Sequence, residues 1–353
     1  MRHPLQAFSG RYFVSSPDAA ASNDGGRRLF SYSREHCDTS RVLQGRAAAP
    51  CPLVFEVPED DASGGGELEV EELRRFLRHP VRHLLRRLGI RPPRAVALLG
   101  ESEPFALTKL ERYRLREELF RLALAGKPLA AARAEVLATG RVPHGGVGEC
   151  LLRQEEDALT LFRRAVTAAA GELLPPPAPG PLVLAPDGGV QPRGAPALAG
   201  ADGLLFLAPR PPWQGEWPAL WLRHLLRCRL EGADTVSRLF WWQEGRLRQC
   251  RLLGVADAAQ RLRELLQMYR LGRCRPLHLF PKSSRAFAEA ERDGKDAWRQ
   301  AGTAWQGSEH VPGEAEDFYC RVAFRDLPSP LDREFERLSR QLYAPLLEHC
   351  RED

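Results

Sequence analysis

Lysine is scarce in this sequence, and arginine takes its place. Four of the 51 basic residues are lysines, at positions 109, 127, 282 and 295, and only two of the 353 residues are methionine. Together with abundant alanine, glycine and proline, this composition is typical of a GC-rich genome, so the frequency of arginine indicates no function by itself. The net charge of +5 is small beside 51 basic and 46 acidic residues. Overall charge therefore does not call for a nucleic-acid partner.

Several motifs are absent, and each absence bears on a class of protein. No run of about 18 apolar residues occurs, so no transmembrane helix is expected. The P-loop string G-x-x-x-x-G-K-[ST] is missing, which excludes that mode of phosphate binding. The eight cysteines stand far apart without a C-x-x-C pair, so zinc ribbons and thioredoxin-like sites are unsupported. The opening MRHPLQAFSGRYF lacks the apolar segment of a secretory signal, and we therefore expect a reducing, cytoplasmic location.

The composition of the chain changes near Glu67. Residues 1–66 alternate short apolar patches with polar, glycine-rich inserts, which predicts an N-terminal tail and linker. Residues 67–353 are predicted to form one large domain. Apolar spacing predicts helices over residues 73–88 (broken at Pro80), 107–125, 129–139, 149–174, 217–232, 256–272 (closed by Gly272) and 331–349.

Short apolar runs predict a few strands. They lie at residues 182–184 and 204–207 and in a hairpin over 237–253 that turns at Gln243-Glu244-Gly245. A helix-rich chain with a few strands predicts an α/β layer architecture.

Four arginines recur at intervals of four residues, and we call them the arginine row: Arg74, Arg78, Arg82 and Arg86. On one continuous helix they would share a face, where each like-charged pair destabilises an isolated helix by about 0.2–0.5 kcal/mol. Such a row becomes favourable when an anion sits against it, either DNA phosphates or the carboxylates of a partner. The alternative is a solvated basic face.

His144 lies in the string GRVPHGGVGE (140–149), where four glycines leave the backbone bare before a predicted helix. A histidine in this setting can ligate a metal or approach a phosphate. A single histidine is more often structural, and both interpretations stay open.

Carboxylates are too few for metal-dependent cleavage of a phosphodiester. That chemistry needs two or more converging carboxylates and usually a nearby lysine. The strand region offers only Asp187 and Asp202, and between Leu204 and Trp217 there is one acid, Glu216, and no lysine. The sequence therefore predicts no catalytic residue, no metal site and no cofactor in this chain.

Trp241 and Trp242 are adjacent in the predicted hairpin. Neighbouring residues of a strand point to opposite faces, so one tryptophan can enter the core while the other faces outward. With Arg246 and Arg248 on the return strand, an exposed Trp242 can stack on a base or separate a duplex. The alternative is a second layer of helix that covers this face.

A series of strings along the chain resembles the C-terminal region of the RecC family, the gamma chains of the exodeoxyribonuclease V (RecBCD) helicase-nuclease. The strings are RHPLQAFSGRYF (2–13), RLFSYSREH (28–36), LRRFLRHPVRHLLRRLGI (73–90), SEPFALTKLERYRLREEL (102–119), GRVPHGGVGE (140–149), YRLGRCRPLHLFPKSS (269–284) and FYCRVAFRD (318–326). Their order and spacing make the match specific, and it is weakest over residues 175–255.

The resemblance implies a restriction-endonuclease-like fold, of the PD-(D/E)XK type, that lacks a complete active site. It implies a non-catalytic DNA-binding and scaffolding role in double-strand break repair and homologous recombination, with RecB-like and RecD-like subunits in a hetero-oligomer away from membranes. It also implies that Mg²⁺ and ATP are used by the partner subunits. His144 then corresponds to the remnant of the nuclease histidine and Asp202 to that of the first metal carboxylate.

Complete RecC chains carry a large helicase-like half before this region. The sequence leaves open whether the chain is a C-terminal fragment or starts at an internal Met1. A second interpretation is an active metal-dependent DNA nuclease of the AddB or Cas4-like type. Such nucleases carry a complete metal site and commonly an iron–sulfur cluster held by four cysteines, and the cysteine spacing here offers no such set.

Overall fold

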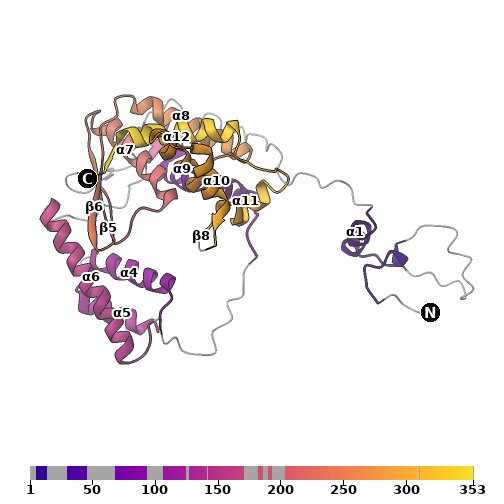
Figure 1. Ribbon diagram of the computed structural model, residues 1–353, viewed down its shortest axis with the longest axis horizontal. Helices are drawn as coiled ribbons and strands as arrows, with labels where there is room; N and C mark the ends of the chain where they lie inside the picture. The colour runs from indigo at the N-terminus through magenta and orange to yellow at the C-terminus, as the bar shows by residue number, and fades with distance from the viewer. Residues whose placement is uncertain are drawn as a thin grey trace, which may run out of the picture. The chain divides into compact units, whose positions relative to one another are not determined.

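The computed structural model describes most of the second half of the chain and parts of the first. The described residues are 5–13, 30–45, 68–93, 106–124, 127–140, 142–170, 182–185, 190–192, 203–309 and 311–352. The chain divides into two compact units, Met1–Leu53 and Val54–Asp353 (Figure 1). The predicted domain boundary at residue 66 lies outside the described residues, as does the predicted linker from residue 46 onward.

The first unit contains a helix that the sequence analysis did not predict. Helix α1 (Arg34–Leu43) begins after Ser33, whose hydroxyl accepts a hydrogen bond from the His36 N–H at 3.2 Å. This is the usual action of a serine N-cap, which satisfies a donor that the first turn leaves unpaired. A short 3₁₀ turn, η1 (Gly10–Tyr12), packs so closely that a Cβ at Gly10 would clash with the Gln44 side chain.

The second unit is built on a four-stranded mixed sheet in the order β4-β5-β6-β9. Its strands are β4 (Leu204–Ala208), β5 (Ser237–Gln243), β6 (Arg246–Leu252) and β9 (Cys350–Glu352). Strands β4 and β5 are parallel and the other neighbours antiparallel. Parallel neighbours need a crossover connection, which helix α7 (Trp217–Glu231) provides. The strand predicted at 204–207 and the predicted hairpin are thereby confirmed.

The hairpin between β5 and β6 turns where the sequence predicts it. Glu244 and Gly245 both adopt left-handed φ values, 51° and 74°, the geometry with which a two-residue turn follows the twist of its strands. The register places Trp241 opposite Arg248 and Trp242 opposite Leu247. The two tryptophans therefore point to opposite faces of the sheet.

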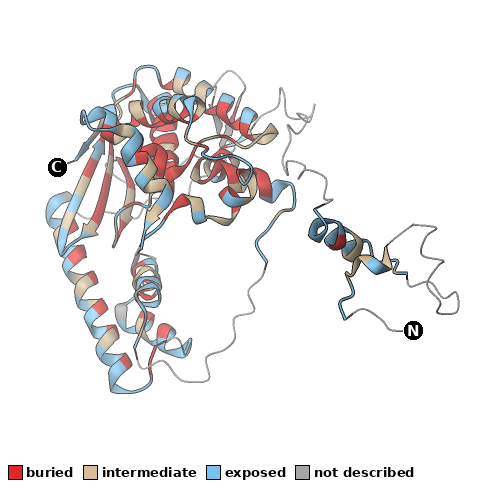
Figure 2. Ribbon diagram, turned by 45° about the vertical axis from the view of Figure 1, so that its right-hand side comes forward, coloured by how far each residue is buried: buried red, intermediate tan, exposed pale blue. Residues whose placement is uncertain are grey.

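Helices cover the face of the sheet that carries Leu239 and Trp241. They are α2 (Val70–Arg78), α7, α8 (Ala258–Cys274) and α12 (Arg333–His349). They share one hydrophobic core with the strands (Figure 2). The prediction that Gly272 closes α8 is wrong, because the helix continues to Cys274. Gly272 instead permits close packing, since a Cβ there would lie 2.4 Å from the Phe76 ring.

A group of three helices packs on the opposite face of the sheet. It consists of α4 (Lys109–Leu124), α5 (Leu129–Ala138) and α6 (Gly146–Ala170), all near the positions predicted from apolar spacing (Figure 1). Their own core includes Phe120 and Phe162, and Leu207, Trp242 and Leu247 of the sheet pack against it. This group thus shares its core with one end of the sheet.

The remaining helices surround a core rich in aromatic residues. They are α3 (Pro80–Arg87), α9 (Pro281–Arg292), α10 (Ala297–Gln306) and α11 (Phe318–Ala323). The sequence analysis predicted only the first of these. The start of α9 is satisfied by Glu314, whose carboxylate accepts hydrogen bonds from the backbone N–H groups of Lys282 and Ser283 at 2.9 and 2.8 Å. Because this cap comes from a distant segment, no local pattern marks the helix.

Two small sheets and two 3₁₀ turns complete the described structure. They are β1 (Leu68–Glu69), β2 (Leu182–Leu184) and β3 (Val190–Pro192) in one sheet, β7 (Gly307–Ser308) and β8 (Val311–Pro312) in the other, and η5 (Gln214–Glu216) and η6 (Glu314–Glu316). The predicted helix-rich α/β class is therefore confirmed. Among the described residues, no helix combines the length and apolarity that a membrane span requires.

Candidate anion-binding site

The arginine row does not lie on one continuous helix. Helix α2 ends at Arg78 and α3 begins at Pro80, which confirms the predicted break. His79 joins the two helices: its Nδ1 accepts a hydrogen bond from the Arg82 N–H at 3.2 Å, and its Nε2 lies 3.4 Å from the Asp317 carboxylate. The row therefore divides into one pair on α2 and one on α3.

The α3 pair faces helix α11 of the same chain. The Nε of Arg86 donates a hydrogen bond to the Tyr319 hydroxyl at 2.9 Å, and its guanidinium lies 5.7 Å from the centre of that ring. Burial, followed by the positive charge of Arg86, lowers the pKa of the Arg82 guanidinium, while the carboxylate of Asp317 opposes this shift. The α3 pair is thus partly occupied by contacts within the chain.

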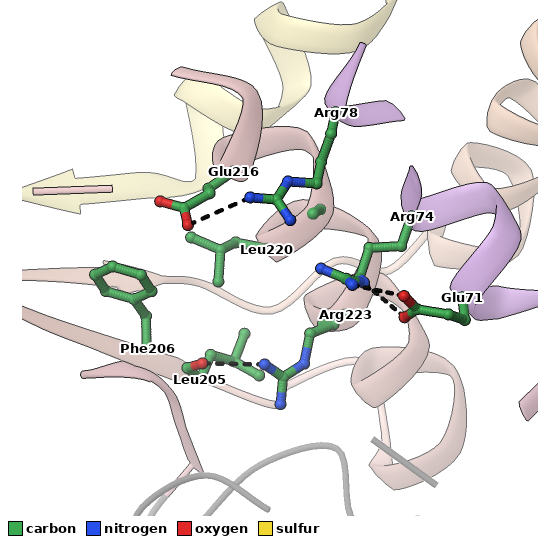
Figure 3. A pocket seen from close by; sticks show the side chains of 9 residues that line it. Glu71, Arg74, Arg78, Leu205, Phe206, Glu216, Leu220 and Arg223 are labelled. Carbon is green, nitrogen blue, oxygen red and sulfur yellow. Dashed lines mark hydrogen bonds and ion pairs between the residues drawn. The ribbon is translucent and has the colours of Figure 1, made fainter. Parts of the chain in front are cut away.

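The α2 pair lines a pocket of about 280 Å³ between α2, β4 and α7, which we call the arginine pocket (Figure 3). Its lining residues are Glu71, Arg74, Arg78, Leu205, Phe206, Glu216, Ala219, Leu220 and Arg223. The pocket thus combines arginines from two helices with apolar side chains from the sheet and α7. The sequence analysis missed Arg223, although an arginine inside the apolar helix segment WPALWLRHLL was a usable signal.

Glu216, the one acid between Leu204 and Trp217, is occupied by other protein groups. Its carboxylate accepts two hydrogen bonds from the Arg210 guanidinium, at 2.6 and 2.9 Å, and one from the Trp213 N–H at 2.7 Å. Burial alone would raise the pKa of Glu216, but these hydrogen bonds outweigh it and hold the pKa below its usual range. The carboxylate is therefore ionised and paired at neutral pH.

Arg210 also contacts helix α4. Its Nε lies 3.2 Å from a carboxylate oxygen of Glu117, and its guanidinium stands 5.8 Å from the centre of the Tyr113 ring. One arginine thus links the end of β4, the turn before α7 and the three-helix group, which makes the Arg210–Glu216 pair part of the framework of the fold.

The other arginines of the arginine pocket also contact groups of the chain, and Nη1 of Arg223 donates a hydrogen bond to the Leu205 carbonyl at 3.2 Å. Arg74 is paired with Glu71 through two hydrogen bonds of 2.7 and 2.6 Å. Arg78 lies 3.8 Å from the already paired Glu216, and its buried Nε has no hydrogen-bond partner among the described residues. The pKa of Arg223 is lowered to about 10, because the side chain is buried and because Arg74 and Arg227 are also positive.

Of the two residues predicted as the remnant of a nuclease site, the structure describes only His144. His144 is exposed in the loop before α6. Asp202 and Asp187 lie outside the described residues. Glu216 is bound by arginine, as described above. The assignments of His144 and Asp202 stay predictions.

The hairpin tryptophans are largely occupied by packing. Trp241 is buried, and the ring of Trp242 lies 5.8 Å from that of Phe162 in α6. The arrangement matches the alternative in which helices cover this face, but Trp242 is only partly buried, and its stacking on a base stays a prediction. Arg246 and Arg248 are exposed on β6 and remain available for a contact with DNA or a partner.

Sequence reasoning also missed a cluster of three groups that could hold a metal ion. Ligand atoms of His79, Asp317 and Cys320 lie within 4.8 Å of one another. Asp317 also accepts hydrogen bonds from the backbone N–H groups of Tyr319 and Cys320, at 2.9 and 3.2 Å, and so caps α11. Through these contacts the cluster connects α2, α3 and α11, which gives it a structural role.

Comparison with known proteins connects this geometry to a family. The family model of the RecC C-terminal domain matches residues 65–292. This chain belongs to the RecC family. It is 27% identical over 330 residues to the RecBCD enzyme subunit RecC of Escherichia coli (strain K12), covering 90% of this chain and 28% of that protein. It is 25% identical over 336 residues to the RecC subunit of Mycobacterium tuberculosis, covering 88% and 28%. The chain thus spans 28% of the length of these RecC relatives.

Proposed function

We propose that this chain is a non-catalytic, DNA-binding and scaffolding part of an exodeoxyribonuclease V (RecBCD-type) helicase-nuclease, acting in double-strand break repair and homologous recombination. The observation that carries the proposal is the pairing of Glu216 with Arg210. The one acid between Leu204 and Trp217 is held by a guanidinium and a backbone N–H, so this carboxylate is not open to a metal.

The chemistry of phosphodiester hydrolysis supports this assignment. Two-metal catalysis requires several carboxylates around the ions, and the segment from Leu204 to Trp217 supplies one, already bound by three donors, and no lysine. The alternative, an active nuclease of the AddB or Cas4-like type, would require Glu216 to exchange its guanidinium partner for a metal. Among the described residues, no group of four cysteines gathers to hold an iron–sulfur cluster.

We also propose that the fold is of the restriction-endonuclease-like, PD-(D/E)XK type. The parallel pair β4–β5, joined through α7 within a mixed sheet that has helices on both faces, supports this proposal. His144 and Asp202 are then remnants of the nuclease site. The Mg²⁺ and ATP of the complete reaction are used by the partner subunits.

The partners follow from the family. The relatives are named as subunits of a RecBCD enzyme, so we propose DNA and RecB-like and RecD-like subunits as the partners of this chain. The exposed arginines on the outer end of the hairpin, Arg246 and Arg248, and the arginine row are the proposed contact residues.

Co-expression with the RecB-like subunit of the same organism tests the scaffolding part of this proposal. We expect the two chains to elute together from a gel-filtration column at 0.5 M salt and to retard a labelled DNA duplex at low salt. A tagged DNA-binding protein of similar size serves as the control. Separate elution of the two chains at both salt concentrations would contradict the scaffolding role.

A further inference from the structure

We propose that Cys250 of β6 and Cys350 of β9 form a reversible thiol–disulfide site, which a low-molecular-weight disulfide such as oxidised glutathione converts to an intramolecular disulfide. The site lies at one edge of the four-stranded sheet, where β9 is the outermost strand. The proposal concerns neither the arginine row nor the hairpin arginines, and it does not rest on the proposed function.

The register of the sheet places both cysteines on the same face. Cys350 is opposite Leu252, and Cys250 is opposite Glu352. Residues two positions apart on a strand share a face, so the two cysteines are diagonal neighbours on adjacent strands, an arrangement in which side chains come within reach of each other. The hydrophobic core on this face includes Cys250, and Cys350 packs against that core.

The two thiols are in contact through a hydrogen bond. This bond is the first cause of two opposite shifts, because it raises the pKa of Cys250 and lowers the pKa of Cys350. The S–H of Cys250 therefore donates to the sulfur of Cys350, which is the one that ionises. The positive charges of Arg285 and Arg292 also lower the pKa of Cys350, while burial and the charge of Glu352 oppose them. Sulfur atoms in such contact need only a small movement to reach the roughly 2.05 Å of an S–S bond.

The two cysteines differ in their access to solvent. Cys250 is completely buried, with 0% of its surface exposed, whereas Cys350 is partly exposed. The thiolate is the form of cysteine that attacks a disulfide. Cys350 is therefore the attacking residue, since it ionises more readily and an oxidant can reach it. Cys250 has to reach only the neighbouring sulfur of Cys350.

The reaction consists of two thiol–disulfide exchanges. The thiolate of Cys350 attacks one sulfur of oxidised glutathione, the S–S bond of glutathione breaks, and one glutathione leaves as a thiolate that takes up a proton. Cys250 then gives its proton to the solvent and attacks the Cys350 sulfur, which releases the second glutathione in the same way. Two protein thiols are thus oxidised to one disulfide, and one glutathione disulfide is reduced to two thiols.

The disulfide fixes the edge strand to the sheet. Strand β9 has only three residues, and it is the outer partner of β6. A bond between Cys250 and Cys350 also closes the segment that contains α8 to α12, and a cross-link over a long segment restricts the unfolded chain. We therefore expect the oxidised chain to melt several degrees above the reduced chain.

Mass spectrometry of the full chain tests the pair. The wild type is incubated with oxidised glutathione, the remaining thiols are blocked with N-ethylmaleimide, and the chain is digested with trypsin. Cleavage after arginine places Cys250 in peptide 249–251 and Cys350 in peptide 341–351. We expect a disulfide between these two peptides that dithiothreitol removes. A glutathione adduct on the exposed Cys150 shows in the same digest that the oxidant has reacted.

Variants test the order of the two exchanges. Cys250→Ala lacks the second thiol, so we expect it to stop at a glutathione adduct on Cys350. Cys350→Ala should leave Cys250 unmodified, because that thiol is buried. Cys37→Ala, at a partly exposed cysteine of α1, is the matched control and should form the same disulfide as the wild type.

Thermal unfolding gives a second readout. Oxidation should raise the melting temperature of the wild type and of Cys37→Ala, and it should not do so in Cys350→Ala. A wild-type digest in which Cys150 carries glutathione while Cys250 and Cys350 stay unlinked would overturn the proposal, and so would a disulfide from Cys350 to a different cysteine. Both of these results are read from the wild type, so they do not depend on how well the variants fold.

Discussion

Arg210 and Glu216 form a bidentate ion pair, in which the guanidinium donates hydrogen bonds of 2.6 and 2.9 Å to the two carboxylate oxygens. The pair closes the turn between β4 and α7, and its two residues stand six positions apart in the sequence. It gives the only acid between Leu204 and Trp217 a structural partner.

Replacing Glu216 with glutamine should destabilise the fold by about 2–3 kcal/mol at pH 7, because a charged hydrogen-bonding pair is broken while Arg210 stays half buried. The pKa of Glu216 is held below the ordinary value of 4.5 in the folded state. Its contribution is therefore present above pH 4.5 and is lost as the pH falls through the lowered pKa.

Urea unfolding of the wild type and of Glu216→Gln at pH 7 and pH 3 measures this contribution. The difference in unfolding free energy should be large at pH 7 and smaller at pH 3. A difference that is the same at both values would show that Glu216 is not ionised in the fold. Glu336→Gln, in an ion pair with the exposed Arg340 on α12, is the control.

The double variant Arg78→Ala with Arg82→Ala tests the arginine row. If both residues meet phosphates, the log–log salt slope for duplex DNA should fall by roughly 1.5–2. The free energy of unfolding should hardly change, because burial and the neighbouring charge of Arg86 already disfavour the charged form of Arg82. Salt titrations by fluorescence anisotropy supply the slopes.

Arg163→Ala with Arg164→Ala, two exposed arginines of α6, controls for the loss of net charge. Normal DNA binding with loss of the RecB-like partner would assign the row to a protein interface. Unchanged DNA binding together with unchanged partner binding would identify a solvated face and contradict the proposal for the row.

Trp242 is expected to act in packing. Trp242→Ala removes the contact with Phe162, and we expect a loss of about 1–3 kcal/mol, less than for a fully buried tryptophan, with faster proteolysis in α4–α6. Trp242→Phe should recover most of the stability. An unchanged stability with weakened binding of single-stranded DNA would instead restore the interpretation of Trp242 as a base-stacking residue.

His224 should make the fold sensitive to mild acid. It is buried between Ser237 and the Leu253 carbonyl, each 2.8 Å from a ring nitrogen. Burial above all, with the positive charge of Arg227 added, lowers its pKa from 6.5 to about 4. The unfolded chain therefore binds the proton first, and stability falls as the pH drops from 6.5 to 4, by about 3 kcal/mol in total.

Unfolding free energies measured between pH 7 and pH 4 check this expectation. His224→Gln should be less stable at pH 7 and should lose most of the pH dependence in this range. His144→Gln, at an exposed position, should keep it. A wild-type curve that stays flat between pH 6.5 and 4 would contradict the assignment of a neutral, buried His224.

Local signals allowed much of the fold to be predicted from the sequence. Pro80 stopped α2 because proline lacks the N–H that a helix interior needs. Glu244 and Gly245 marked the hairpin because that turn requires positive φ. The prediction that Gly272 ends α8 was wrong. This glycine instead lets α2 and α8 approach each other.

The arginine pocket could not be predicted in the same way. Arg78 and Glu216 are brought together by packing across a long stretch of sequence, and periodicity carries no information about such pairs. The same holds for α9, whose first turn is satisfied by Glu314 from a distant segment. What the sequence did show was that the segment from Leu204 to Trp217 holds one acid and no lysine. This was enough to argue against metal chemistry but did not reveal that Arg210 binds the acid.

We propose that this member of the RecC family binds DNA and does not cut it. The most direct test incubates the purified chain with end-labelled linear DNA and Mg²⁺, and separates the same samples on native and denaturing gels. The account predicts a retarded complex on the native gel and full-length strands on the denaturing gel, for the wild type and for Asp202→Ala alike. Cleavage products from the wild type that disappear in Asp202→Ala would contradict it.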